Sequence, residues 1–308
     1  MFSIFLGLTP FIFITFLGFI FGKLKVLDLS HAKILNLFLF YIAVPALIIR
    51  LLAQNEIGQV DLKQIISYLI MQSICGIIAY LITSKYFKRP VPESIIWSLT
   101  VALSNHVTLL LPITEIYFQQ NVITQVASII LMDGVILLSV IAFFLELSTK
   151  KNVNLFTFFK NLFFNPFILS VIIGLLILLL NFNIDQTPID YTLSRLAACV
   201  SPVGLFAIGI ILSFYTVDII NKLSVSISVL KLIISPIILL LIGLLFFNSG
   251  LPSEIPGAFF VSVAPCGVTA IVLCSAYNVS PENIIKAIFV STIASIGTIF
   301  LAIRYLTL

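Results

Sequence analysis

Charged residues are scarce in this sequence of 308 residues. Only 9% of them are Asp, Glu, Lys or Arg, whereas soluble domains carry about 25%. Tryptophan occurs once and histidine twice. This shortage of charge argues against a soluble enzyme or a nucleic-acid-binding domain, and the 61% of hydrophobic residues indicates an integral membrane protein.

Several chemical signatures are also missing. No phosphate-binding glycine loop, zinc-ligand spacing or serine triad occurs, so we expect neither an enzyme nor a metal site or organic cofactor. The four cysteines, Cys75, Cys199, Cys266 and Cys274, lie in apolar segments without a CxxC spacing and are expected to be free thiols. The first apolar run follows no basic leader, which predicts a retained span rather than a cleaved signal peptide.

Ten apolar runs are long enough to cross a bilayer, which takes about 20 residues each. They show no strand alternation, and a bilayer admits only helices or closed barrels. The predicted fold class is therefore an all-α integral membrane protein with ten transmembrane helices. The predicted spans cover residues 4–22, 34–53, 63–84, 93–118, 123–147, 161–181, 190–214, 223–247, 256–278 and 282–305.

The basic residues are distributed unevenly between the turns. If the first span enters from outside, 12 of the 16 basic residues lie at cytoplasmic turns and helix ends, which predicts both termini outside. The cytoplasmic group is Lys23, Lys25, Lys33, Lys85, Lys88, Arg89, Lys150, Lys151, Lys160, Lys222, Lys231 and Lys286. The outer group is Arg50, Lys63, Arg195 and Arg304.

Two predicted spans are interrupted by polar residues, proline or glycine. The span at 93–118 contains Ser104-Asn105-His106 and then Pro112, and the span at 256–278 contains Ala264-Pro265-Cys266-Gly267. Unwound backbone is tolerated at membrane depth only inside protein or beside a water-filled cavity. Prolines that merely kink packed helices are the alternative. Two breaks in corresponding places favour the substrate site of a secondary transporter.

The two halves of the sequence resemble each other. Thr9-Pro10-Phe11-Ile12 is matched by Asn165-Pro166-Phe167-Ile168, and Pro45 corresponds to Pro202 at nearly the same offset. That offset also brings Asn105-His106 close to Ala264-Pro265. Because five spans per half is an odd number, the second half must be inverted in the membrane. The predicted repeats are residues 1–150 and 151–308.

Short motifs run along the whole chain: residues 41–48, Ser104-Asn105 with Pro112, Asn165-Pro166, residues 201–209, Lys231 with Pro236, and Ala264-Pro265. In these motifs the sequence resembles the auxin efflux carrier family of secondary transporters in its compact bacterial form. Val107 and Leu110 stand where this family usually has glycines, and His106 is unusual there, which leaves the shape of the cavity and the substrate open.

The resemblance implies a fold similar to sodium/proton antiporters and bile-acid symporters, with helices 4 and 9 broken and crossing. It also implies an elevator-type motion of a core, spans 3–5 and 8–10, against a scaffold of spans 1, 2, 6 and 7. The expected location is the plasma membrane, as a bacterial inner-membrane protein. A homodimer through the scaffold helices is compatible with this arrangement.

A crossing of two broken helices brings helix amino termini to the membrane midplane, where they can bind a carboxylate. The predicted substrate-binding residues are Asn105, His106, Pro112, Ala264, Pro265 and Cys266. Asn105 has a donor and an acceptor with which to orient the substrate, or it caps the broken helix. His106 either senses or relays protons or is a hydrogen-bonded packing residue.

Three of the charged residues within the predicted spans are candidates for a role in transport. Asp133 has no cation at helical spacing in its own segment, and the resemblance to antiporters makes it the candidate for proton or sodium coupling. The alternative is a protonated or paired aspartate that only stabilises the bundle. Lys231 is expected to extend to the cytoplasmic surface rather than attract substrate, and Glu115 to lie near the outer interface rather than gate.

The leading hypothesis is a secondary active transporter or facilitator of small organic anions, such as carboxylates and auxin-like weak acids. One alternative is a sodium-coupled symporter of the bile-acid type. Another is a membrane sensor that binds a ligand without moving it, although no soluble signalling domain is visible in the sequence. The expected partners are the small organic anion and the lipid bilayer, with no nucleic acid.

Overall fold

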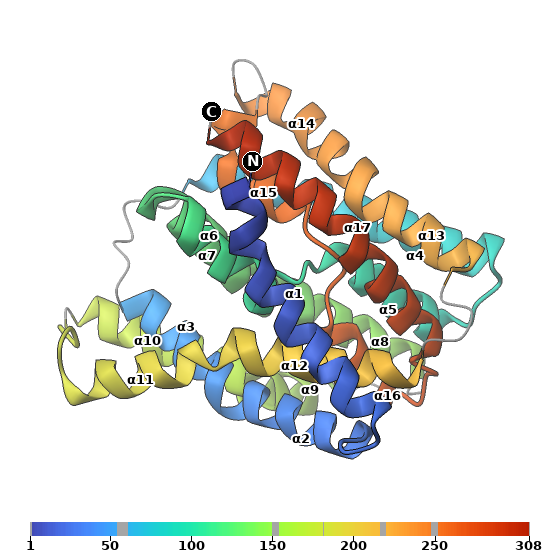
Figure 1. The fold of residues 1–308 in the computed structure, drawn as a ribbon, viewed down its shortest axis with the longest axis horizontal. Coiled ribbons are helices and arrows are strands. Elements are labelled where there is room, and N and C mark those ends of the chain that lie inside the picture. The colour runs from blue at the N-terminus through green and yellow to red at the C-terminus, as the bar shows by residue number, and fades with distance from the viewer. Residues whose placement is uncertain are drawn as a thin grey trace.

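The computed structural model describes residues 2–53, 61–149, 154–180, 182–215, 220–247 and 252–307. In these ranges the regular structure is helical, apart from an isolated antiparallel β-bridge between Ser104 and Cys266 (Figure 1). The prediction of an all-helical membrane protein is confirmed. Lys150 and Lys151, which contribute to the predicted topology, lie outside the described residues.

Seven continuous helices in the described ranges are long and apolar enough to cross a membrane. Several of them contain a π-helical turn, labelled η, in which the backbone hydrogen bonds reach one residue further than in an α-helix. The seven are α1 (Phe2–Lys23); α2 (Leu29–Phe38), η1 (Leu39–Ala43) and α3 (Val44–Ala53); α4 (Leu62–Leu81) and η3 (Ile82–Tyr86); α7 (Gln120–Met132), η5 (Asp133–Leu137) and α8 (Leu138–Thr149); α11 (Pro188–Ala198) and α12 (Val200–Phe214); α13 (Lys222–Val229), η6 (Leu230–Ile234) and α14 (Ser235–Phe246); and α17 (Glu282–Leu306).

A further pair of helices passes the same test only when it is taken together. α9 (Leu155–Phe163) and α10 (Pro166–Leu179) meet at a bend of 60°. The single helix predicted over 161–181 is therefore wrong at its beginning. The break has a local cause, because Pro166 lacks a backbone N–H and the Asn165 side chain accepts a hydrogen bond from the Phe167 N–H at 2.9 Å, which starts a new helix.

The two predicted interruptions are both present. The fourth predicted span consists of α5 (Val91–Ala102), an extended residue at Leu103, η4 (His106–Leu110) and α6 (Leu111–Tyr117). The ninth consists of α15 (Pro256–Ser262), preceded by the short 3-10 turn η7 (Pro252–Glu254), and α16 (Thr269–Ala276). The fourth span unwinds at residues 103–105, whereas Pro112 lies within the first turn of α6. Pro112 therefore does not make the break, since proline fits the first turn of a helix.

The helices pack into two groups, which we name the lower and upper groups from their places in Figure 1. In the lower group α3 packs on α10 and α11, and α12 packs on α1 and α2. In the upper group α4 packs on α5 and α14, α15 on α7, and α13 on α17. The broken segments belong to the upper group and face the lower group along η4, which contacts α12.

Close approach between α1 and α12 depends on glycine. A Cβ atom on Gly18 would collide with the Phe206 carbonyl, and a Cβ atom on Gly209 would collide with the Thr15 carbonyl. Small residues allow membrane helices to approach closely and gain dispersion contacts where no hydrophobic effect drives their association. The outward sides of the helices carry many exposed Phe, Leu and Ile side chains, as expected for surfaces that face lipid.

Candidate functional site

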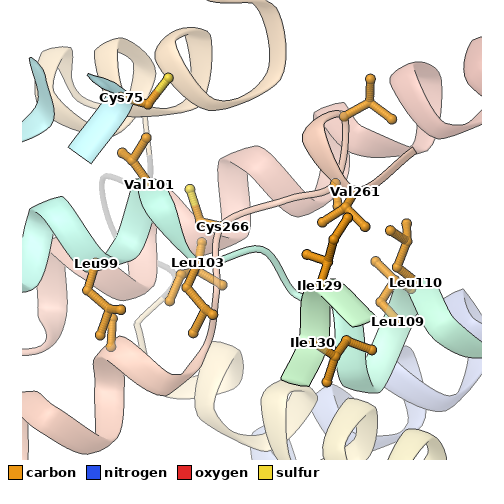
Figure 2. Close-up of a cluster of buried hydrophobic side chains, with 14 of the residues drawn as sticks. Cys75, Leu99, Val101, Leu103, Leu109, Leu110, Ile129, Ile130, Val261 and Cys266 are labelled. Carbon is orange, nitrogen blue, oxygen red and sulfur yellow. The ribbon is translucent and has the colours of Figure 1, made fainter. Parts of the chain in front are cut away.

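The backbones of the two broken spans are paired where they cross. The Asn105 N–H donates to the Pro265 carbonyl at 3.0 Å, and the Gly267 N–H donates to the Leu103 carbonyl at 2.8 Å. Figure 2 shows Leu103 and Cys266 next to each other at this crossing, among buried apolar side chains. The unwound groups thus satisfy one another, and this is what allows irregular backbone to persist inside a membrane protein.

Helix α17 supports the second break from behind. The Cys266 N–H donates to the Ser291 hydroxyl at 3.2 Å, and the Thr298 hydroxyl donates to the Val263 carbonyl at 2.8 Å. Both partners come from the polar face of α17, which therefore supplies hydrogen bonds that the broken helix cannot make for itself.

Asp133 is the first residue of η5 and is completely buried. The Gln72 side-chain amide donates to its Oδ1 at 2.5 Å, and His106 Nε2 lies 2.9 Å from its Oδ2. Gln72 also donates to the Ala102 carbonyl at 3.2 Å. A buried carboxylate is stable only when it is paired and hydrogen-bonded. Three elements, α4, η4 and η5, provide this network.

Lys231 lies at the other side of the crossing, and its predicted extension to the cytoplasmic surface is wrong. Its side chain is 1% exposed, and Nζ donates to the Ser104 hydroxyl at 2.7 Å. Ser104 in turn donates to the Val261 carbonyl at 3.0 Å, and the Tyr68 hydroxyl lies 3.4 Å from it. The ammonium is too deep to reach water, and its hydrogen bond goes to the Ser104 hydroxyl instead.

A cavity of about 310 Å³ opens between the two helix groups. Residues 104–108, which end the break and begin η4, form one wall with parts of η5, α8 and α16, and the opposite wall comes from α2, η1, α10 and α12. Most of the lining is apolar, with a few polar groups among it, as in sites that bind small organic molecules. The polar lining residues are Asn36, Ser104, Asn105, His106, Thr108, Ser139, Asn165 and Thr269.

Two helix amino termini reach this cavity. The helical segment η4–α6 begins at His106 and α16 begins at Thr269, and both residues line the cavity. The unpaired N–H groups of a helix start carry partial positive charge, which favours an anion. Lys231 Nζ donates to the hydroxyl of Ser104, which also lines the cavity, so a basic side chain lies directly behind the lining.

The structure separates the predicted site residues into two sets. Asn105 and His106 line the cavity, whereas Pro112, Ala264, Pro265 and Cys266 do not belong to its lining. Asn105 Oδ1 accepts a hydrogen bond from the Thr108 hydroxyl, and the asparagine side chain makes no capping bond to the backbone. No described residue accepts a hydrogen bond from the side-chain NH2 group of Asn105, so this donor is left for a bound molecule.

A family model described as membrane transport protein matches residues 3–303. The chain belongs to this family. It is the family of the auxin efflux carriers, so the resemblance is confirmed along nearly the whole chain. The membrane transport family is one of transporters and not of enzymes, and the membrane-embedded, multi-pass chain is therefore a transporter. Among curated proteins none matches it.

Sequence reasoning missed two residues of this transporter's site, Gln72 and Tyr68. They lie four positions apart in the apolar run of α4 and therefore share one helix face. A glutamine in the middle of a span was a usable signal, because a polar side chain at that depth needs a partner inside the protein. Glu115 is exposed on α6, away from the cavity lining.

Proposed function

We propose that the transporter is a secondary carrier or facilitator of small organic anions, carboxylates and auxin-like weak acids among them. The observation that carries the proposal is the cavity at the crossing, where two helix amino termini converge and Lys231 lies behind Ser104. A carboxylate bound there accepts hydrogen bonds from the Asn105 amide and from backbone N–H groups. The apolar remainder of the lining holds the substrate's hydrocarbon part.

We further propose ten spans in two inverted repeats, with both termini outside and the protein in the bacterial inner membrane. Two pairs of buried residues support the repeat. Lys231 lies 159 positions after Gln72, and Ser291 lies 158 positions after Asp133, close to the offset that relates the Pro-Phe-Ile runs of the two halves. Both pairs surround the crossing, Gln72 and Asp133 from the first half and Lys231 and Ser291 from the second.

An elevator-type motion suits the position of the cavity. One wall comes from the lower helix group, the proposed scaffold, and the other wall comes from the crossing in the upper group, the proposed core. A substrate held by the crossing would move with the upper group when that group slides against the lower one. A homodimer through the lower group would keep the scaffold in place.

The coupling centre that we propose is Asp133 with His106. Gln72 donates to one carboxylate oxygen and His106 Nε2 is hydrogen-bonded to the other, which favours coupling to protons. A sodium-coupled symporter of the bile-acid type is the competing function. Its test is the dependence of flux on a sodium gradient at constant pH.

The transport experiment uses purified protein in liposomes with labelled acetate, succinate, benzoate and indole-3-acetate, against protein-free liposomes. We expect protein-dependent flux of at least one of them, and loss of that flux in Asn105→Ala. Asn121→Ala is the matched control, because Asn121 is exposed at the start of α7 and outside the cavity lining. Absence of protein-dependent flux for every carboxylate, under proton and sodium gradients alike, would refute the proposed function.

A further inference from the structure

The imidazole of His106 has one nitrogen without a partner. Among the described residues, only two buried side-chain nitrogen or oxygen atoms lack a hydrogen bond, Arg89 Nε and His106 Nδ1. Arg89 Nε lies 3.7 Å from a carboxylate oxygen of Glu93, whereas the Nδ1 atom has no such neighbour. His106 is 4% exposed and lines the cavity. A buried polar atom without a hydrogen bond destabilises the protein unless a ligand provides the missing partner.

The hydrogen bond of His106 Nε2 determines the charge that accompanies each protonation state of Nδ1. His106 Nε2 and Asp133 Oδ2 share one proton across 2.9 Å, whichever of them holds it. When Nδ1 is bare, the His106–Asp133 pair carries one negative charge and presents a lone pair to the cavity. When Nδ1 carries a proton, the pair is neutral and presents an N–H donor. A carboxylate is repelled by the first form and accepts a hydrogen bond from the second.

Few titratable groups of the described elements surround His106. Asp133 and Lys231 are the charged residues nearest the crossing, and Tyr68 and Cys266 are its other titratable groups. Helices α7 and α12, which pack on η4, carry no titratable side chain. The following helix α6 carries only Tyr117 and the exposed Glu115.

We propose that a substrate carboxylate binds the protonated Nδ1 of His106, so that each carboxylate crosses the membrane together with one proton. The inference rests on the proposed function, because it names the ion that accompanies the anion. The proton comes from the compartment in which the anion binds and is released with it on the other side. Asp133 is then a fixed counter-ion that orients the ring, and Gln72 holds that counter-ion in place.

The test is proton uptake on binding, measured by titration calorimetry of the whole protein in buffers of different ionisation enthalpy. The probes are succinate and indole-3-acetate at pH 7.5. We expect an uptake close to one proton per bound carboxylate group that reaches the site. Binding without proton uptake by the wild-type protein overturns the inference and leaves the proposed function standing, whereas neither binding nor flux refutes the proposed function itself.

Two variants separate His106 from Asp133 as the proton carrier. In His106→Gln, the amide can still donate to Asp133 but cannot titrate, so we expect flux to become independent of pH and proton uptake to vanish. In Asp133→Asn, the histidine remains, so we expect pH-dependent flux with its optimum displaced to lower pH. If pH dependence instead survives in His106→Gln and disappears in Asp133→Asn, the proton is carried by Asp133 and the inference fails.

The second histidine of the chain provides the control. His31 lies at the start of α2, with its side chain 50% exposed, and pairs with Asp28 at 2.9 Å. We expect His31→Gln to leave both proton uptake and the pH profile unchanged. Should His106→Gln fail to fold, as judged by gel filtration, the calorimetric proton count of the wild-type protein alone decides between the outcomes.

Discussion

The Lys231 ammonium donates to the Ser104 hydroxyl at 2.7 Å, although the two residues lie 127 positions apart in the chain. A helix of the second half thereby places a cation against the unwound segment of the first half. Both residues are buried, so water screens little of this charge. The contact joins the two halves at the point where the substrate is proposed to bind.

Replacing Lys231 by Met should weaken anion binding. The side chain keeps its length and apolar stem but loses its charge, and a charge acting through an effective dielectric near 20 contributes on the order of 2 kcal/mol. We expect roughly a 30-fold loss in carboxylate affinity, measured by calorimetry. Stability should change little or rise, because removing a buried charge relieves its desolvation.

Lys222→Met is the matched control for this variant. Lys222 is exposed at the beginning of α13, in the same span as Lys231 and outside the cavity lining. Its replacement should leave the affinity within a factor of about two, since exposed charges are screened. An unchanged affinity in Lys231→Met, with the protein folded, would show that the buried cation has no part in binding.

Replacing Gln72 by Leu should destabilise the protein. The change removes the donor to Asp133 Oδ1 and to the Ala102 carbonyl, and leaves both acceptors buried. A buried acceptor without its donor costs about 1–3 kcal/mol. We expect a lower midpoint of thermal unfolding in detergent, and a smaller effect from Gln72→Glu if the new carboxyl group binds a proton and donates it to Asp133.

Gln119→Leu is the matched control, because it replaces an exposed glutamine by leucine. Gln119 is exposed ahead of α7 and makes no side-chain capping bond. Surface changes of this kind usually stay within about 0.5 kcal/mol. Equal unfolding midpoints for Gln72→Leu and Gln119→Leu would contradict a supporting role for Gln72.

The two breaks could be located from the sequence because polar residues and Pro-Gly combinations are costly inside an apolar run unless the helix is interrupted there. Asp133 and Asn105 could be singled out because a polar side chain at that depth needs a partner inside the protein. The position of the fourth-span break could not be derived from Pro112, because a proline is compatible both with a break and with the first turn of the helix that follows.

Lys231 shows why contacts between residues far apart in the chain could not be predicted from the sequence. A lysine two turns inside a span is ordinarily expected to extend toward the interface. Only the tertiary structure reveals that Lys231 donates to Ser104, which donates in turn to the Val261 carbonyl. Gln72 could have been singled out by its depth in the span, as Asp133 was, but the two could not have been paired. They lie 61 positions apart, and no local pattern relates them.

Replacing Gly267 by Ala should disturb the crossing. A Cβ atom there would lie 2.8 Å from the Leu103 carbonyl oxygen and 2.9 Å from its Cγ, so the two broken segments would have to separate. Overpacking of this kind costs about 1–3 kcal/mol. We expect a lower unfolding midpoint and reduced flux, because the backbone hydrogen bond between Gly267 and Leu103 would weaken as well.

Gly297→Ala is the counterpart in the same chain. A Cβ atom on Gly297, inside α17, meets nothing within 4 Å. Alanine restricts the unfolded chain and favours the helix, so this variant should be more stable by roughly 0.5–1 kcal/mol. The prediction fails if the two glycine variants shift the unfolding midpoint in the same direction.

The ion pair between Arg50 and Asp190 should contribute to stability and not to transport. Arg50 Nε lies 3.0 Å from Asp190 Oδ1, which ties α3 to α11 inside the lower helix group, and neither residue lines the cavity. The Arg50 side chain is 34% exposed, so solvent screens the pair and its coupling energy should not exceed about 1 kcal/mol. A double-mutant cycle of Arg50→Met and Asp190→Asn, followed by thermal unfolding at low and high salt, measures it. We expect the coupling to shrink in high salt while flux per folded molecule stays constant, because the charges that act on the substrate are those at the crossing. A large loss of flux in folded Asp190→Asn would show instead that the lower group helps to determine the charge at the site.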